Sequence, residues 1–411
     1  MKIKKISIFF ILIICFSFSH CFGVGITVQS QSAILIHADT GKILYEKNSN
    51  IPMYPASTTK IMTAILTLEN TNLNDIATVS SSALNYIPSG YSTANLQVGE
   101  QFTIEQLLHV LLIPSANDAA NVLAEHVGGS IIEFSDMMNK KAVEIGCKNT
   151  NFVNPSGIHS NSQYSTAYDL ALIGQYAMKN PTFKAIVAKT TCSLPPTNIY
   201  PLDNRHFNTT NLLLRESSSS SNSYYYPYAI GIKTGFTTPA GNCLVAKSSH
   251  NGLNFIVCIL GGRKDNSGND QRFSDAINLF NYAYNNYLIK EIHPENSVVD
   301  IIEVKNATQD TKYLNLLVKD NISVFISNKD LGKNILPEIT LRENLKAPIE
   351  QGETVGHIKY VIEDITYESD LIAQNSVEKE TIFSILKKIL YFITLPFKFF
   401  KVYRGIFIKI V

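Results

Sequence analysis

The sequence comprises 411 residues, of which 45% are hydrophobic and 17% are charged, and its formal net charge is +1. The length exceeds that of one ordinary domain, and the apolar content supports a sizeable core, which excludes a disordered chain. The near-neutral charge argues against a nucleic-acid-binding protein, because such proteins usually carry a basic excess.

The N-terminus has the layout of a secretion signal. Three lysines within the first five residues precede an apolar run, 6–18, that is too short to span a bilayer comfortably. We therefore expect residues 1–25 to be a signal peptide. A lipid-modified Cys21 and an uncleaved anchor are the alternatives.

Elements with clear periodicity follow in the order strands, helices, strands and helix. The turn sequence Asp39–Lys42 lies between two strand-like runs, and the pair Asn251–Gly252 separates two later strands. The predicted elements are a hairpin over 32–45, helices over 57–69, 104–112, 117–127 and 131–145, strands over 229–234, 242–246 and 254–260, and a helix over 273–288. This order predicts an α+β domain over 26–290, in which an antiparallel sheet packs against a helical cluster, with the first hairpin and the last helix brought together.

The remainder of the chain differs in pattern. Residues 291–377 show short strands with turns and no long helix, which predicts a small all-β domain, a β-sandwich. Residues 378–411 contain six bases in their last thirty positions and no acid there, with lysines and aromatic residues on opposite sides of a helix. We expect an amphipathic helix that lies on an anionic membrane surface and holds a secreted protein on the outer face of the membrane. The serine- and tyrosine-rich segment 216–228 is predicted to be a solvated, flexible loop.

The cysteines indicate no metal site. Cys147, Cys192, Cys243 and Cys258 form no CxxC pair and have no ligand spacing with histidine. We predict neither zinc nor a structural disulfide, and no cofactor.

Three short segments could carry chemistry. Ser57 and Lys60, in Pro55–Lys60, are one helical turn apart at a predicted helix start. A lysine whose pKa is lowered by burial or by nearby positive charge could accept the proton of the hydroxyl. Ser115 and Asn117 lead into another helix, and Lys233-Thr234-Gly235 ends a predicted strand. Each segment alone is weak, because a serine N-cap or a lysine in a strand is common.

Together and in this order, SxxK, SxN and KTG resemble the low-molecular-weight penicillin-binding proteins, the serine D-alanyl-D-alanine carboxypeptidases of peptidase family S11. The resemblance extends over nearly the whole chain after the signal. It includes 55–64, 151–157, 164–171, 208–213, 231–237, 240–243, 345–349 and 352–356.

The resemblance implies catalytic roles for named residues. Ser57 would be the nucleophile that forms an acyl-enzyme, and Lys60 its proton acceptor. Ser115 would relay a proton, Asn117 would hold the substrate amide, and backbone N–H groups of Ser57 and Phe236 would bind the oxyanion.

The resemblance also implies binding roles. Lys233 and Thr234 would grip the terminal carboxylate of the leaving D-alanine, and Gly235 would let a ligand approach the strand closely. Arg272 would assist carboxylate binding, with Arg263 as the alternative. The expected partners are the peptidoglycan stem pentapeptide and β-lactams, which would act as inhibitors.

Three other functions remain open. A β-lactamase would need a base for rapid deacylation, and no convincing Glu-x-x-x-Asn stands between SxN and KTG. An endopeptidase or transpeptidase that acts on cross-links is poorly separated from a carboxypeptidase by sequence. A non-catalytic binding module would normally have lost one of Ser57, Lys60 or Lys233.

Overall fold

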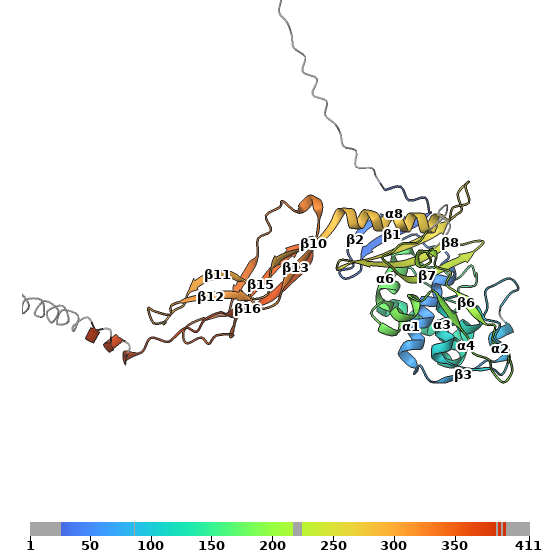
Figure 1. The fold of residues 1–411 in the computed structure, drawn as a ribbon, viewed down its shortest axis with the longest axis horizontal. Coiled ribbons are helices and arrows are strands. Elements are labelled where there is room, and N and C mark those ends of the chain that lie inside the picture. The colour runs from blue at the N-terminus through green and yellow to red at the C-terminus, as the bar shows by residue number, and fades with distance from the viewer. Residues whose placement is uncertain (1–25, 86, 217–223, 384, 388, 392–411) are drawn as a thin grey trace, which may run out of the picture.

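A computed structural model describes residues 26–391 except 86, 217–223, 384 and 388. Within these residues the chain forms a larger α+β body followed by a smaller all-β body (Figure 1). The predicted signal peptide and most of the predicted C-terminal helix lie outside the described residues. Among the residues that the structure describes, no helix combines the length and apolarity needed to cross a bilayer.

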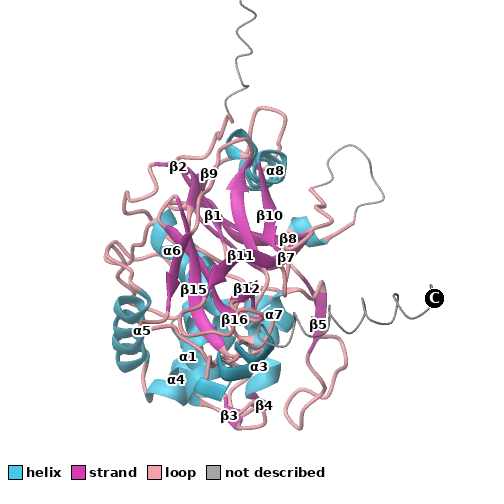
Figure 2. Cartoon of the chain, turned by 90° about the vertical axis from the view of Figure 1, so that its left-hand side faces the viewer, coloured by secondary structure: helices cyan, strands magenta, loops and turns pink. Residues whose placement is uncertain are grey.

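A five-stranded antiparallel sheet forms the centre of the larger body (Figure 2). Its strand order is β2-β1-β9-β8-β7, so β2 and β7 lie at the edges and β9, the last of the five in sequence, lies at the centre. The strands are β1 (Ser32–His37), β2 (Ile43–Lys47), β7 (Ala229–Thr237), β8 (Gly241–His250) and β9 (Leu253–Gly262). The turn at Asn251 and Gly252, both at positive φ, joins the last two strands as predicted.

Both faces of the sheet are buried. Alternate residues of β9 point to opposite sides: Ile256, Cys258 and Leu260 join the core shared with the helical cluster, whereas Val257 and Ile259 join the core under the last helix. The larger body therefore has three layers.

Polar side-chain caps mark the start of α3, α5, α6, α7 and α8. The helices are α1 (Lys60–Asn70), α2 (Ser81–Asn85), α3 (Ile104–Leu112), α4 (Asn117–Gly128), α5 (Ile131–Ile145), α6 (Ala167–Ala177), α7 (Pro181–Val187) and α8 (Gln271–Asn286), with short 3-10 turns at Ala56–Thr59, Leu212–Leu214 and Asn328–Asp330. Thr103 and Gln106 form a capping box at the start of α3. The larger body also contains two short antiparallel strand pairs, β3 (Ile76–Thr78) with β4 (Gln101–Thr103) and β5 (Thr191–Ser193) with β6 (His206–Asn208).

The N-terminal segment and α8 meet as the sequence predicts. The buried carboxylate of Asp275 accepts hydrogen bonds from the backbone N–H groups of Gln29 (3.0 Å) and Ser30 (2.8 Å) and from the Ser30 hydroxyl (2.6 Å). One side chain of α8 thus ties down the chain that leads into β1.

The smaller body contains strands only, apart from one 3-10 turn. Its strands are β10 (Tyr287–His293), β11 (Val298–Glu303), β12 (Tyr313–Val318), β13 (Ile322–Ser327), β14 (Glu338–Leu341), β15 (Thr354–Ile362) and β16 (Ile365–Ala373). A sheet in the order β11-β12-β16-β15-β14 and the pair β10-β13 enclose one apolar core. The predicted fold class, an α+β domain followed by an all-β domain, is confirmed.

Two local predictions are wrong. The helix expected over 273–288 ends at Asn286, because Tyr287 and the next residue pair with β13. In the segment 216–228, residues 217–223 lie outside the description, but the tyrosines that follow do not belong to a solvated loop. Tyr226 is buried against Phe280 of α8, and its hydroxyl donates to Asn281 at 3.1 Å.

Candidate active site

The sequence predicted that Ser57 begins an α-helix, but it lies in a tight turn that precedes the helix. Residues Ala56–Thr59 form a 3-10 turn, and α1 begins at Lys60. Because side chains three residues apart are nearly eclipsed in a 3-10 turn, Lys60 projects beside Ser57. Its Nζ lies 3.1 Å from Ser57 Oγ.

Two glycines, Gly157 and Gly235, pack closely against the backbone of this turn, and we call this contact the clamp. A Cβ on Gly157 would lie 1.9 Å from the carbonyl oxygen of Ala56, and a Cβ on Gly235 would lie 3.0 Å from the backbone nitrogen of Ser57. Ala56 itself has a φ of 47°, in the left-handed region that non-glycine residues seldom adopt. The turn is thus held in a strained conformation by close backbone packing. Gly235, which was expected to let a ligand approach the strand, packs closely on this turn and also lines the cleft described below.

Lys60 is fully buried, and three oxygen atoms lie within hydrogen-bond distance of its amine. It contacts Ser57 Oγ, the Asn117 side-chain oxygen at 2.7 Å and the Ser156 carbonyl oxygen at 2.5 Å. Burial and the nearby Lys233 hold the pKa of Lys60 well below its usual range, against an opposing effect of Asp118. The environment thus favours the neutral amine, which can accept a proton.

The SxN segment supplies a hydroxyl and an amide to the same place. Ser115 has a φ of 72°, and its buried Oγ has no hydrogen-bond partner within the described chain. Asn117 accepts from Lys60 and donates to the Ser92 carbonyl oxygen at 2.9 Å. Neither residue caps α4, whose N-cap Ala116 makes no side-chain bond, so an ordinary capping role does not explain this serine.

The sequence predicted the KTG segment at the end of a strand, but it lies inside β7, because this strand continues to Thr237. Lys233 is 1% exposed and donates to the Thr234 carbonyl oxygen at 3.0 Å, and burial and Arg272 lower its pKa to about 7. The Thr234 hydroxyl lies 2.5 Å from that of Thr210. An anion bound here would raise the pKa of this lysine and restore its charge.

These segments meet in a cleft of about 430 Å³ along the edge strand. Ser57, Ser115, Asn117, Thr234, Gly235, Phe236 and Arg272 all line it, and the Phe236 ring is 61% exposed. Arg272 is held by Asp270 at 2.8 Å and donates to the Gly235 carbonyl oxygen at 2.9 Å. Arg263, the alternative, is not among the lining residues.

Sequence reasoning assigned no role to three residues that the structure places here. Ser156 accepts from Lys60, Thr210 contacts Thr234, and Ser92 holds Asn117. The first two lie in segments that resemble the family, 151–157 and 208–213, but their contacts depend on the folded chain. Ser92 had no sequence signal.

The described part of the chain holds no group of three or more metal-ligating side chains. Cys147, Cys192, Cys243 and Cys258 are free thiols.

The fold and the cleft place the chain among penicillin-binding proteins. Penicillin-binding protein 5 from Haemophilus influenzae has the same fold, with a TM-score of 0.62, 24% identity and coverage of 86% of this chain and 98% of that one. The chain matches the D-alanyl-D-alanine carboxypeptidase family over residues 22–264 and the penicillin-binding protein 5 C-terminal domain over 287–379. It belongs to the D-alanyl-D-alanine carboxypeptidase family.

Two further relatives show how far the similarity extends. The D-alanyl-D-alanine carboxypeptidase DacF of Bacillus subtilis is 30% identical over 367 residues, 88% of this chain and 89% of that protein. A variant of the DD-transpeptidase of Streptomyces K15 is 33% identical, with a TM-score of 0.56, and covers 63% of this chain and 99% of its own. The first similarity includes both bodies of the fold.

Proposed function

We propose that this protein is a serine-type D-alanyl-D-alanine carboxypeptidase that removes the terminal D-alanine from peptidoglycan stem pentapeptides. One observation carries the proposal. The hydroxyl of Ser57 lies 3.1 Å from the buried amine of Lys60, whose pKa is lowered by burial and by Lys233. A weak nucleophile beside a neutral amine is the pairing that acyl transfer requires.

In the acylation step, Ser57 Oγ attacks the carbonyl carbon of the penultimate D-alanine. Its proton passes to Lys60 Nζ, and the N–H groups of Ser57 and Phe236 stabilise the oxyanion. The C–N bond then breaks, and the proton returns through Ser115 to the amine of the departing D-alanine. The unpartnered Ser115 hydroxyl supports this relay, because a buried group without a partner is costly unless substrate completes it. Water hydrolyses the ester and frees Ser57.

Binding uses the edge of the sheet. Lys233 and Thr234 bind the terminal carboxylate, with Arg272 supporting the strand through its bond to the Gly235 carbonyl oxygen. Asn117, which also lines the cleft, holds the substrate amide. A peptide at an exposed edge strand can add main-chain hydrogen bonds as an extra strand would.

Intact-mass spectrometry with penicillin and a D-alanine-release assay on a diacyl-Lys-D-Ala-D-Ala peptide test the proposal together. We expect one covalent adduct on the wild type, loss of D-alanine release when penicillin is present, and neither reaction in Ser57→Ala. If Ser57→Ala acylates as readily as the wild type, the assignment of the nucleophile is wrong.

Action on cross-links is the second candidate, favoured by the similarity to the Streptomyces DD-transpeptidase. Product analysis with a pentapeptide and with a cross-linked dimer separates the two activities. Release of D-alanine without cleavage of the dimer supports the carboxypeptidase.

The proposal extends to location. Residues 1–25 would direct secretion, 26–290 form the catalytic domain, 291–377 the β-sandwich domain, and 378–411 the helix on the anionic outer surface of the membrane. Exposed apolar side chains at the described start of the last segment support it, with Ile382 and Phe383 each 79% exposed. Co-sedimentation with anionic and with neutral vesicles tests it: the chain truncated after residue 377 should lose binding. Equal sedimentation of both chains would contradict the anchor.

A further inference from the structure

The buried carboxylate of Asp118, directly after the SxN segment, has no part in the acyl-transfer steps. Asp118 is 1% exposed, and both of its oxygens accept hydrogen bonds from backbone N–H groups. The N–H of Ala94 lies 3.0 and 2.9 Å from the two oxygens, and that of Leu96 lies 3.1 Å from one of them. Burial raises the pKa of this carboxyl, and these N–H donors, with that of Ala119, oppose the rise by stabilising the ionised form.

Ala94 and Leu96 belong to a loop, 89–96, that forms one wall of the catalytic cleft. Residues 89–92 all line the cleft, and Asp118 binds the loop just after them. The loop contains no helix or strand, so bonds from other segments hold it in place. Because Ala94 and Leu96 are buried, their N–H groups would have no partner without this carboxylate, which is costly.

The same loop sets the orientation of Asn117. The carbonyl oxygen of Ser92 accepts from the backbone N–H and from the side-chain NH₂ group of Asn117, each at 2.9 Å. The oxygen of this amide therefore faces the amine of Lys60, at 2.7 Å. An amide has donors at one end and an acceptor at the other, so a shift of the Ser92 carbonyl would free Asn117 to turn and would change the group that Lys60 meets.

We propose that Asp118 is a positioning residue of the acylation step, which fastens the loop 89–96 as a wall of the cleft and so keeps the Asn117 amide aimed at Lys60. Asp118 does not line the cleft, and it acts through the loop and Asn117. The inference rests on the proposed acyl transfer by Ser57 and names a residue on which the arrangement of the catalytic groups depends.

The charge of Asp118 also acts on Lys60 directly. Burial and the charge of Lys233 lower the pKa of Lys60, and the carboxylate of Asp118 opposes both. Without that carboxylate the pKa of Lys60 should fall further, so the amine should stay neutral down to a lower pH. A residue that only stabilised the fold would not move this pH, which makes the pH profile a specific measure of the role.

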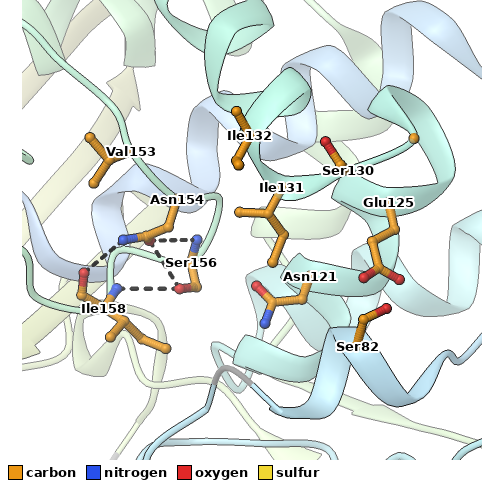
Figure 3. A pocket seen from close by; sticks show the side chains of 11 residues that line it. Ser82, Asn121, Glu125, Ser130, Ile131, Ile132, Val153, Asn154, Ser156 and Ile158 are labelled. Atoms are coloured by element: carbon orange, nitrogen blue, oxygen red, sulfur yellow. Dashed lines mark hydrogen bonds between the residues drawn. The ribbon is translucent and has the colours of Figure 1, made fainter.

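The helix α4 supplies a matched control in Glu125, about two helical turns after Asp118. The carboxylate of Glu125 accepts a hydrogen bond from the Ser80 hydroxyl. It lies, beside Asn121 and Ser82, in a separate pocket of about 570 Å³ that shares no lining residue with the catalytic cleft (Figure 3). Glu125→Gln therefore removes an acid of the same helix, keeps an acceptor for Ser80, and leaves the loop 89–96 bound to Asp118.

Rates of penicillin acylation measured by stopped flow from about pH 4 to 9 test the role. Asp118→Asn keeps the size of the side chain but sets an NH₂ group against the N–H of Ala94. We expect acylation to slow about 10- to 100-fold and the acid limb of the profile to move to lower pH. Asp118→Glu keeps the charge but displaces both oxygens, so acylation should slow while the acid limb stays in place. Glu125→Gln should match the wild type in both respects.

The rate constant of adduct formation does not depend on how much of a sample is folded, because an unfolded fraction lowers the amplitude and not the rate. If Asp118→Asn acylates within about threefold of the wild type, or slows without a shift of its acid limb, the positioning role is refuted. Release of D-alanine by the wild type would still support the carboxypeptidase in that case. If the wild type is acylated but releases no D-alanine, the proposed carboxypeptidase fails, and the acylation rates still decide the role of Asp118.

Discussion

Replacing Gly157 by alanine should inactivate the enzyme through the turn that carries Ser57. The new Cβ would lie 1.9 Å from the Ala56 carbonyl oxygen and 2.9 Å from the Ser57 nitrogen. Ordinary contacts start at 3.4 Å, so the two segments must separate by about 1.5 Å. The Ser57 hydroxyl would move away from Lys60 by a comparable distance.

The expected magnitude follows from two separable costs. Gly157 has a φ of 82°, and an alanine there is strained by about 1–2 kcal/mol. Overpacking adds about 1–3 kcal/mol. Gly146 is the matched control, since its φ is 100° but a Cβ would meet nothing within 4 Å. Gly146→Ala should thus show the backbone cost alone.

Urea unfolding and the rate of penicillin acylation separate the two variants. We expect Gly157→Ala to lose about 2–5 kcal/mol in the free energy of unfolding and at least about 100-fold in acylation rate, because a displacement of 1 Å can cost that much. Gly146→Ala should acylate at the wild-type rate. An acylation rate for Gly157→Ala within about threefold of the control would refute the clamp.

Three other outcomes are expected. Lys60→Gln should slow penicillin acylation about 10²- to 10⁴-fold by removing the base, and an unchanged rate in stopped-flow assays would contradict its role. The pH profile of kcat/KM should be bell-shaped. Activity should fall on the acid side because Lys60 gains a proton and can no longer accept one, and on the alkaline side, from about pH 7, because Lys233 loses the charge that binds carboxylate. A flat profile from about pH 5 to 9 would count against both roles. Arg205 and Glu100 form a buried ion pair, so Arg205→Met should cost about 3–5 kcal/mol in the free energy of unfolding, because it leaves the carboxylate of Glu100 buried and unpaired. Arg342→Met breaks the more exposed ion pair of Arg342 with Glu353 and should cost less than about 1 kcal/mol in the same urea titration.

Periodic segments were the part of the fold that sequence predicted well. The helices over 104–112 and 131–145 have the predicted limits, since polar caps and apolar faces coincide there. Predictions failed where tertiary pairing overrides local pattern. Tyr287 continues a helical pattern but pairs with Ser327 in a sheet. Tyr226 stands in a polar, serine-rich context, yet α8 offers it an aromatic surface.

The candidate site divides in the same way. SxxK, SxN and KTG are recognisable as short patterns, so sequence could name Ser57, Lys60 and Lys233 before any fold was known. Contacts between distant segments carry no local signal. The hydrogen bond from Lys60 to the Ser156 carbonyl oxygen joins residues 96 positions apart. Its acceptor is a backbone atom, which every residue type has, so the sequence gives no sign of it. The glycine at 157 could be read as permissive, but only the fold shows which carbonyl it admits.

The clamp on the Ser57 turn has a consequence for how the protein matures. Gly157 comes from the loop after α5, and Gly235 comes from the edge strand β7, which is distant from that loop in sequence. A chain that has collapsed without docking these layers would hold every catalytic side chain yet lack a reactive hydroxyl. Covalent labelling by a β-lactam would then report only the fraction of molecules that have completed folding.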